Sequence, residues 1–471
     1  MNNPVIIQGG MGAGVSGWPL AKAVSKMGQL GVVSGTALDT IFVRRLQDGD
    51  IGGHLRRALA QFPAPQVVQE ILKKYFVPGG KPKNAPYQLL PLYTATPHVT
   101  DQALTVVSNF SEVFLAKEGH EGMIGINYLE KIQFPLLASL YGAMLAGVAY
   151  VLIGAGIPRE IPGLLDRLAR HEEVSIKLHI ANGSSEDDFR IRFDPKQIIS
   201  QTLPILPRPK FLAIIASVTL ATALVKKSTG KIDGFVIEGP TAGGHNAPPR
   251  GPQQLNTKGE PVYGQKDDVD LEAIKALGLP FWLAGSYGDP EQLKRARAHG
   301  AAGVQVGTAF AYCRESGLAE EIKCKLLERA SRGDVEVFTD PVASPTGFPF
   351  KVVKMENSMS EQEIYEARPR QCDLGYLRHA YRKEDGSLGY RCPAESVEAY
   401  VSKGGKREET DGRKCLCNGL MATINFPQMR QNGYVEKPIV TSGDDLSKVA
   451  RFLRKGETSY SAADVIEQLL G

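Results

Sequence analysis

The sequence predicts an α/β protein whose parallel strands close into a (β/α)8 TIM barrel, with a helical and Pro-rich insertion and a Cys-containing C-terminal extension. Short runs of β-branched and other apolar residues recur through the first two thirds of the chain, and helical segments separate most of them. This alternation is typical of βα units in a mainly parallel sheet. Polar or Gly-rich residues follow nearly every run, and (β/α)8 barrels carry their active sites at these carboxyl ends. The second observation favours a closed barrel.

The candidate strands number nine, one more than the barrel needs. They are residues 5–8, 30–34, 123–127, 148–153, 175–180, 211–216, 234–238, 281–284 and 303–306. We expect either 175–180 or 211–216 to lie outside the ring. The uncharged stretch 134–158 is interrupted by glycines, and it divides into a helix at 135–146 and the strand that follows. We interpret it as a buried helix–strand pair rather than a membrane span, because both faces of a parallel strand are covered.

An open dinucleotide-binding sheet is the alternative, since Gly12, Gly14 and Gly17 match G-x-G-x-x-G between a strand and a helix. In that fingerprint the first glycine lies at the strand end, whereas here several residues intervene. The second strand should also be followed by an acidic residue that holds a ribose, and Asp39 comes several residues too late. We therefore favour the barrel.

The composition excludes several classes of function. The 55 Lys and Arg nearly balance the 51 Asp and Glu, and no basic stripe is visible, which argues against nucleic acid or a membrane as partner. Six Cys in 471 residues do not form the disulfide framework of a small secreted protein. The first residues lack the basic flank and apolar run of a signal peptide, so we expect a cytoplasmic protein.

Three parts are expected along the chain. Residues 1–350 would form the barrel, and residues 50–120 would be an insertion that starts helical and then turns Pro-rich. An insertion of this length could cover the mouth of the barrel as a lid or pack as a surface excursion. Residues 351–430 would form a Cys-containing subdomain. Residues 431–471 would form a helical segment that docks on the barrel or on a second copy of the chain in a homo-oligomer.

A double glycine followed by a histidine marks the end of the strand at 234–238. Gly243 and Gly244 would let the backbone approach a flat ligand, while the imidazole of His245 projects over it. Histidine is suited to proton transfer because its pKa lies near neutrality. The alternative is an ordinary loop histidine at a tight turn. The two adjacent glycines favour the functional interpretation.

Two similar loops follow the last two strands of the predicted barrel. Gly285 and Ser286 end one strand, and Gly307 and Thr308 end the next. The loops after strands seven and eight of such barrels often bind phosphate through backbone N–H groups. The alternative is that small residues merely let the strand ends pack. Two such loops in this order favour a phosphate site.

The region after residue 335 loses the βα rhythm and collects cysteine, tyrosine and charge. Four of the six cysteines, Cys372, Cys392, Cys415 and Cys417, lie close together in the sequence. Thiolates at this density indicate a zinc ion or an iron–sulfur cluster, because a small region with little apolar periodicity needs a staple. The alternative is four partly buried free thiols. Just before this group, Ser344 is expected either to line the substrate side of the site or to belong to a rigid, Pro-containing connector.

Five segments together resemble a known family. They are IQGGM at 7–11, GIN at 125–127, EGPTAGGH at 238–245, AGS at 284–286 and GVQVGT at 303–308. These segments resemble the FMN-dependent nitronate monooxygenase (2-nitropropane dioxygenase-like) superfamily. That superfamily also contains flavin-type enoyl-ACP reductases, including trans-acting ones of polyketide and polyunsaturated fatty acid synthesis. The resemblance covers about residues 1–350 and implies FMN as the cofactor.

The resemblance implies a role for each matched residue. His245 would be the catalytic acid/base, and Glu238 stands where nitronate monooxygenases often carry Gln, which weakens the case for a nitronate substrate. Ser217 is a candidate for the substrate side. The cofactor-binding residues would be Gly9, Gly10 and Met11 against the isoalloxazine ring, Asn127 as its hydrogen-bond partner, Gly243 and Gly244 beside His245, Gly285, Ser286, Gly307 and Thr308 at the phosphate, and Gln305 nearby.

Two reactions are compatible with this resemblance. The first is oxidation of alkyl nitronates to a carbonyl compound and nitrite with O2. The alternative is NAD(P)H-dependent reduction of an enoyl thioester, with an acyl carrier protein as partner. A third hypothesis is a flavin-binding protein that has become a structural partner, against which His245 and both phosphate loops argue. Fold and cofactor do not separate the two reactions.

Overall fold

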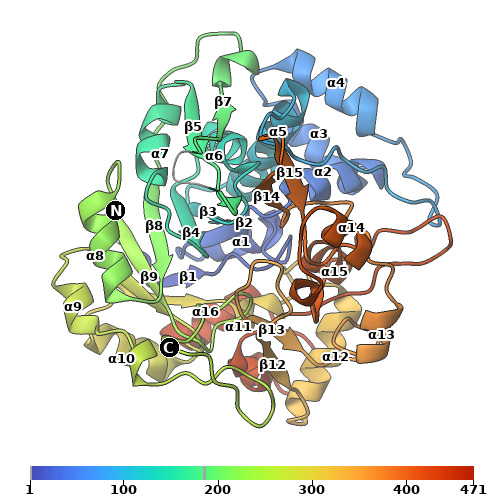
Figure 1. Ribbon diagram of the computed structural model, residues 1–471. Helices are drawn as coiled ribbons and strands as arrows, with labels where there is room; N and C mark the ends of the chain where they lie inside the picture. Colours follow the sequence, from blue (N-terminus) through green and yellow to red (C-terminus); the bar gives the residue numbers. More distant parts are fainter. Residues whose placement is uncertain (1–2, 184–186) are drawn as a thin grey trace.

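The structure is a computed structural model that describes residues 3–183 and 187–471 (Figure 1). Its centre is an eight-stranded parallel sheet in the order β1-β11-β10-β9-β8-β4-β3-β2. The strands are β1 (Ile6–Gln8), β2 (Gly31–Ser34), β3 (Ile124–Leu129), β4 (Tyr150–Gly154), β8 (Lys210–Ile215), β9 (Gly234–Glu238), β10 (Phe281–Ala284) and β11 (Gly303–Val306). The sheet closes where the N–H of Leu30 donates to the carbonyl of Ile6 (3.1 Å) and the N–H of Gln8 donates to the carbonyl of Leu30 (2.9 Å). The predicted TIM barrel is therefore confirmed, and the open dinucleotide-binding sheet is wrong.

The interior of the barrel is a packed apolar core of its own. Alternate strand residues point inward and fill it, as is usual for such barrels. This inner cluster consists of Ile7, Leu30, Val32, Tyr150, Leu152, Leu212, Val236, Trp282 and Ala284. The indole N–H of Trp282 donates to the carbonyl of Pro4 (2.8 Å), which ties the N-terminal segment to the barrel. Because the interior is filled, only the ends of the strands are free to build a site.

Helices cover the outside of the barrel (Figure 1). They are α1 (Trp18–Lys26), α2 (Leu38–Gln47), α5 (Val99–Lys117), α6 (Leu136–Leu145), α7 (Ile161–Ala169), α8 (Val218–Lys227), α9 (Leu271–Lys275), α10 (Pro290–Ala298), α11 (Thr308–Ala311) and α12 (Glu320–Ser331). The uncharged stretch forms α6 and β4, and both are buried as predicted. No helix in the described part of the chain is long and apolar enough to cross a membrane.

The ninth candidate strand lies outside the ring. Of the two alternatives it is 175–180, which forms β5 (Val174–Lys177) and pairs antiparallel with β7 (Arg190–Phe193). The run 211–216 lies in the ring, within β8 and the residue after it. The pattern of apolar residues could not separate the two, because a strand in a small outer sheet also buries one face.

The insertion after residue 50 ends earlier than predicted. It contains η1 (Ile51–Gly53), α3 (His54–Leu59) and α4 (Pro65–Tyr75), and then an irregular stretch up to residue 98. The helix α5 that follows is largely buried and packs against α1 and α6, so it belongs to the barrel's outer layer. None of residues 50–120 lines the cavity described below. The predicted lid therefore does not lie at that cavity.

The remainder of the chain packs on the barrel (Figure 1). Its elements are β12 (Val337–Asp340), β13 (Phe350–Val353), α13 (Gln362–Ala367), β14 (His379–Arg382), β15 (Leu388–Arg391), α14 (Val397–Ser402), η4 (Arg407–Thr410), α15 (Leu416–Thr423), η5 (Asp444–Phe452) and α16 (Ala462–Leu470). The strand β14 pairs with β15 and with β6 (Ile180–Ala181). The short helices η2 (Pro195–Gln197) and η3 (Gln265–Asp267) lie in loops of the barrel. Buried side chains of the C-terminal part, such as Met421, Ile439 and Tyr460, join the same apolar core as the outer layer of the barrel.

Candidate active site

A cavity of about 630 Å³ lies at the carboxyl ends of the barrel strands. This volume is within the range of sites for cofactors and other small molecules. Every predicted cofactor-binding residue lines it, together with His245, Ser217 and Glu238. The cofactor-binding set is Gly9, Gly10, Met11, Asn127, Gly243, Gly244, Gly285, Ser286, Gln305, Gly307 and Thr308. The barrel thus brings the cofactor-binding set, His245, Ser217 and Glu238 together from six of its strand ends.

Glycine is required in the cavity wall for different structural reasons at different positions. A Cβ on Gly10 would lie 2.3 Å from the Cβ of Asn127, so only glycine packs there. A Cβ on Gly243 would lie 2.8 Å from the backbone nitrogen of Gly443. Gly244 has a φ of +81°, and no atom of the described residues beyond its chain neighbours lies within 4 Å of the position of its missing Cβ. Gly244 therefore combines a backbone conformation that other residues rarely adopt with open space beside it, as close approach of a ligand requires.

His245 is held in a partly buried, largely apolar setting. Its Nε2 lies 2.7 Å from the hydroxyl of Ser344. Its ring packs edge-on against Phe350, with 4.9 Å between the ring centroids, and Phe348 lies on another side. Burial lowers the pKa of His245 to about 4. The imidazole is therefore neutral at neutral pH, and its Nδ1 has no hydrogen-bond partner among the residues that the structure describes.

Ser344 acts on the imidazole from behind and does not line the cavity. Its side chain is fully buried, and its hydroxyl also lies 2.8 Å from that of Thr346 and accepts from the Thr346 N–H (3.2 Å). The interpretation that Ser344 lines the substrate side is wrong. The hydrogen bond at one ring nitrogen of a histidine determines whether the other nitrogen carries the proton. Ser344 therefore fixes both the orientation of the His245 ring and the role of its Nδ1.

Glu238 is an isolated carboxyl group in the cavity wall. It is the last residue of β9 and lies in register with Ala284 of β10. Within the described residues it forms no hydrogen bond or ion pair, and burial raises its pKa to about 7. A carboxyl group that titrates near neutrality in a cavity is typical of functional sites.

We expect the substitution Glu238→Gln to stabilise the protein at alkaline pH. The raised pKa means that the folded state binds the proton more tightly than the unfolded state, so the wild type loses stability as pH rises from 4.5 to about 7. The variant should lack this loss and exceed the wild type by about 1 to 3 kcal/mol at pH 8. Chemical denaturation between pH 4.5 and 8.5 measures it, with the exposed Glu363→Gln as the control. Parallel curves for wild type and Glu238→Gln would contradict a carboxyl group whose pKa is raised by its isolated place in the cavity wall.

Two other predicted residues use their polar groups locally. The hydroxyl of Ser217 accepts from the N–H of Leu220 (3.1 Å) and caps α8, so it is engaged in the fold although it lines the cavity. Asn127 donates to the carbonyl of Tyr128 (3.3 Å). In contrast, the Oε1 of Gln305 is buried and has no partner among the described residues. A buried acceptor without a protein partner at a cavity wall is a candidate contact for a ligand.

One part of the site was not predicted. Residues 441–445, which we call the C-terminal strap, cross the cavity, and Thr441, Ser442, Gly443 and Asp445 line it. The N–H of Gly244 donates to the Thr441 hydroxyl (2.9 Å), and the N–H of Gly443 donates to the Thr308 hydroxyl (3.1 Å). No motif in the sequence marks this segment. Its contacts span 197 and 135 residues, and a local pattern carries no signal for them.

The cysteine group lies away from the cavity. Among the described residues, no three His, Cys, Asp or Glu side chains are placed to hold a metal ion, so the predicted metal site at Cys372, Cys392, Cys415 and Cys417 is not found there. All four are free thiols. A hydrogen bond from Cys392 lowers the pKa of Cys372, while Cys392 itself has a raised pKa.

Buried ion pairs hold this region together. Arg368 binds Glu436 (2.7 Å) with both side chains buried, and Arg430 bridges Glu436 and Asp373. These charged pairs, rather than a metal ion, are the polar contacts that the structure shows in this region. The Arg368–Glu436 and Arg430–Asp373 pairs join residues more than 50 positions apart, which spacing alone does not indicate.

Comparison with known proteins agrees with the resemblance. Residues 208–348 match the family model described as nitronate monooxygenase. This segment contains β8 to β11, His245 and both predicted phosphate loops. The resemblance to the nitronate monooxygenase superfamily is thereby confirmed.

Curated relatives match over part of their length. The chain is 37% identical over 121 residues to a probable nitronate monooxygenase of Bacillus subtilis, covering 26% of this chain and 33% of the relative. It is 25% identical over 196 residues to a probable nitronate monooxygenase of Staphylococcus saprophyticus, covering 41% and 51%. A third relative is the (3aS,4S,5R,7aS)-5-hydroxy-7a-methyl-1-oxo-octahydro-1H-indene-4-carboxyl-CoA dehydrogenase of Mycobacterium tuberculosis, 26% identical over 143 residues, 30% of this chain and 36% of that one. The matches span between a third and a half of these relatives.

Solved structures align over nearly the whole chain at low identity. FabK from Thermotoga maritima aligns over 100% of this chain and 92% of its own, with 16% identity and a TM-score of 0.46. The enoyl reductase domain of MlnA from Bacillus amyloliquefaciens aligns over 99% and 92%, with 12% identity and a TM-score of 0.48.

Proposed function

We propose that the protein is an FMN-dependent oxidoreductase that oxidises alkyl nitronates to a carbonyl compound and nitrite, with O2 as the acceptor. The match of residues 208–348 and the names of two curated relatives support this proposal. The observation that carries it is the pairing, in one cavity, of the neutral His245 with the open backbone at Gly244. A flat ligand against Gly244 would lie beside the imidazole of His245.

The cavity fits FMN on three grounds. It has room for a ligand of this class, the Cβ position of Gly244 is open, and the buried Oε1 of Gln305 lacks a partner among the described residues. The N-terminal Gly9, Gly10 and Met11, with Asn127 and Gly244, would hold the ring system, and Gly285, Ser286, Gly307 and Thr308 would hold the phosphate. When bound, FMN would supply the electron acceptor for the substrate and the centre that reacts with O2.

The chain's own residues would bind and orient the substrate. Neutral His245 can donate a hydrogen bond to a nitro oxygen or accept a proton from carbon, and Ser344 fixes its ring. Lys131 and Arg250 line the same cavity and would attract an anionic nitronate. When Glu238 loses its proton, its negative charge would repel the anionic nitronate. We therefore infer that nitronate turnover declines as pH rises through about 7.

A second candidate is the reduction of an enoyl thioester by NAD(P)H, with an acyl carrier protein as the donor of the substrate. A specific observation favours it: part of the cavity wall is apolar and suits an acyl chain. This wall consists of Leu129, Ile157, Ile214, Leu220 and Phe348. The third curated relative is named for a CoA thioester substrate. The protonated carboxyl of Glu238 would then be a second proton donor beside His245.

An anaerobic absorbance titration of the purified protein tests the proposal. Loss of the oxidised flavin bands on addition of ethyl nitronate, but not of NADPH, is the expected result. Loss of the bands with NADPH would move the assignment to the enoyl-thioester reductase. A protein without flavin absorbance, and with none after incubation with FMN, would overturn both.

A further inference from the structure

The C-terminal strap lies between the two loops that would hold the phosphate. The N–H of Gly443 donates to Thr308, and a Cβ on Gly288 would lie 3.5 Å from an oxygen of Asp445. Asp445 therefore sits against the loop after β10 and the loop after β11 at once. The strap can occupy this place because residue 443 is a glycine. A Cβ at this position would lie only 2.7 Å from the Thr308 hydroxyl oxygen, so a larger residue would not fit.

Asp445 is an acidic group where a phosphate is expected. Its side chain is only 8% exposed, it lines the cavity, and its Oδ1 has no well-aligned hydrogen-bond partner among the described residues, although the Thr308 hydroxyl lies close to the carboxyl group. Burial raises the pKa of Asp445, although Thr308 and Arg451 act to lower it. An ionised carboxylate would repel a phosphate, whereas a protonated carboxyl can donate a hydrogen bond to it.

We propose that the protonated carboxyl of Asp445 donates a hydrogen bond to the phosphate of FMN, which makes the C-terminal strap the third wall of the phosphate site. This inference rests on the proposed function, because it takes FMN as the ligand. It adds to the two glycine loops a residue from the far end of the chain. It also makes FMN binding depend on a proton, since ionisation of Asp445 would place two negative charges side by side.

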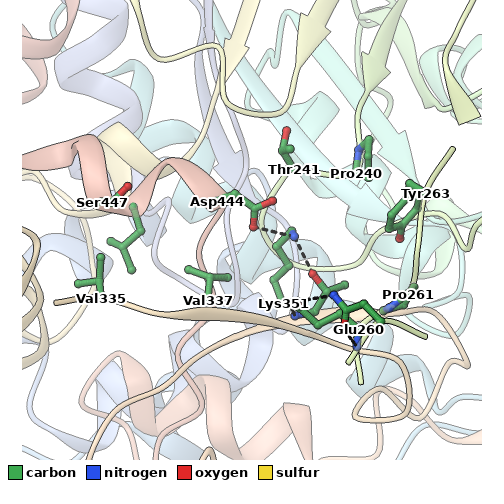
Figure 2. A pocket seen from close by; sticks show the side chains of 13 residues that line it. Pro240, Thr241, Glu260, Pro261, Tyr263, Val335, Val337, Lys351, Asp444 and Ser447 are labelled. Atoms are coloured by element: carbon green, nitrogen blue, oxygen red, sulfur yellow. Dashed lines mark hydrogen bonds and ion pairs between the residues drawn. The ribbon is translucent and has the colours of Figure 1, made fainter. Parts of the chain in front are cut away.

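The other charged and titratable groups near Asp445 do not provide this proton. They are Arg451 on η5, Asp444 beside it in the strap, Tyr312 after α11 and Tyr460 before α16. Burial raises the pKa of both phenols, so they stay uncharged. Arg451 is engaged by Asp289 (2.6 Å). Asp444 turns away to the other side of the strap, where its Oδ1 lies 2.7 Å from the Nζ of Lys351 in a separate pocket of about 400 Å³ (Figure 2).

The test is the pH dependence of flavin affinity, which does not require turnover. FMN and riboflavin dissociation constants are measured by equilibrium dialysis and flavin fluorescence between pH 5 and 9, with the full-length chain. For the wild type, FMN affinity should fall by up to about tenfold per pH unit above the pKa of Asp445. Asp445→Asn should bind FMN with little pH dependence and more tightly than the wild type at pH 9. Riboflavin, which lacks the phosphate, should show no such slope in either protein.

The matched control is Asp444→Asn, which removes the same charge one residue earlier but from the side that faces Lys351. This variant should keep the wild-type slope. A slope that survives in Asp445→Asn, or that appears equally with riboflavin, would overturn the role of Asp445 while leaving the proposed function intact. Riboflavin binding by Asp445→Asn shows that the variant is folded. Failure of the wild type to bind any flavin would instead overturn the proposed function itself.

Discussion

Replacing His245 with alanine should lower kcat/KM for an alkyl nitronate by about two orders of magnitude or more while FMN stays bound. Among the residues that the structure describes, the imidazole is the only histidine side chain in the cavity lining, and it contacts Phe350 and Ser344 rather than the predicted phosphate loops. Under the proposed function, its removal would take away proton transfer and hydrogen bonding to the substrate without touching the residues that would hold the phosphate. Steady-state kinetics with flavin content measured on the same samples tests this expectation.

Two companion variants sharpen the result. Ser344→Ala keeps the imidazole but removes the hydroxyl 2.7 Å from its Nε2. We expect kcat/KM to fall by only about tenfold in this variant, because the ring is less well oriented. His299→Ala makes the same change at an exposed position after α10 and should leave turnover unchanged. Turnover by His245→Ala at the wild-type rate would remove the residue from the chemistry. A loss of FMN in that variant would show instead that the histidine belongs to the cofactor site.

The strand ends of the barrel could be predicted because their signals are local. Each of the loops at Gly244, Gly285 and Gly307 directly follows a short apolar run, so a few consecutive residues carry both the strand and the chemistry. The closed barrel then follows from the number and order of the βα units. The residues that form each strand and its loop are neighbours in the chain, so their pattern is visible in a single sequence.

The features that were missed depend on contacts between distant parts of the chain. Ser344 reaches His245 across 99 residues, and the C-terminal strap reaches Thr308 across 135. Both contacts are made by small polar residues in irregular segments, which have no period and no motif. The apolar residues around them predict burial but not which loop covers the cavity. Tertiary packing alone assigns these residues to the site.

Replacing Gly307 with glutamate should expel FMN. The missing Cβ of Gly307 points toward the side chain of Met11, 3.6 Å from its sulfur, in the cavity wall between β11 and β1. A glutamate side chain growing from this position would put a carboxylate beside the predicted phosphate loops. Because like charges brought together in a buried site cost several kcal/mol, we expect FMN to bind at least about a hundredfold more weakly.

The matched variant Gly307→Ala separates charge from bulk. An added methyl group would be in ordinary contact at 3.6 Å, and φ at this residue is −107°, so alanine should fold and bind FMN nearly as the wild type does. Flavin absorbance per protein after gel filtration measures occupancy, and far-UV circular dichroism checks that both variants are folded. If riboflavin binds to Gly307→Glu while FMN does not, the lost interaction is with the phosphate. Full FMN occupancy in Gly307→Glu would mean that the phosphate lies elsewhere, because an ionised carboxylate beside the phosphate would cause a large loss of affinity.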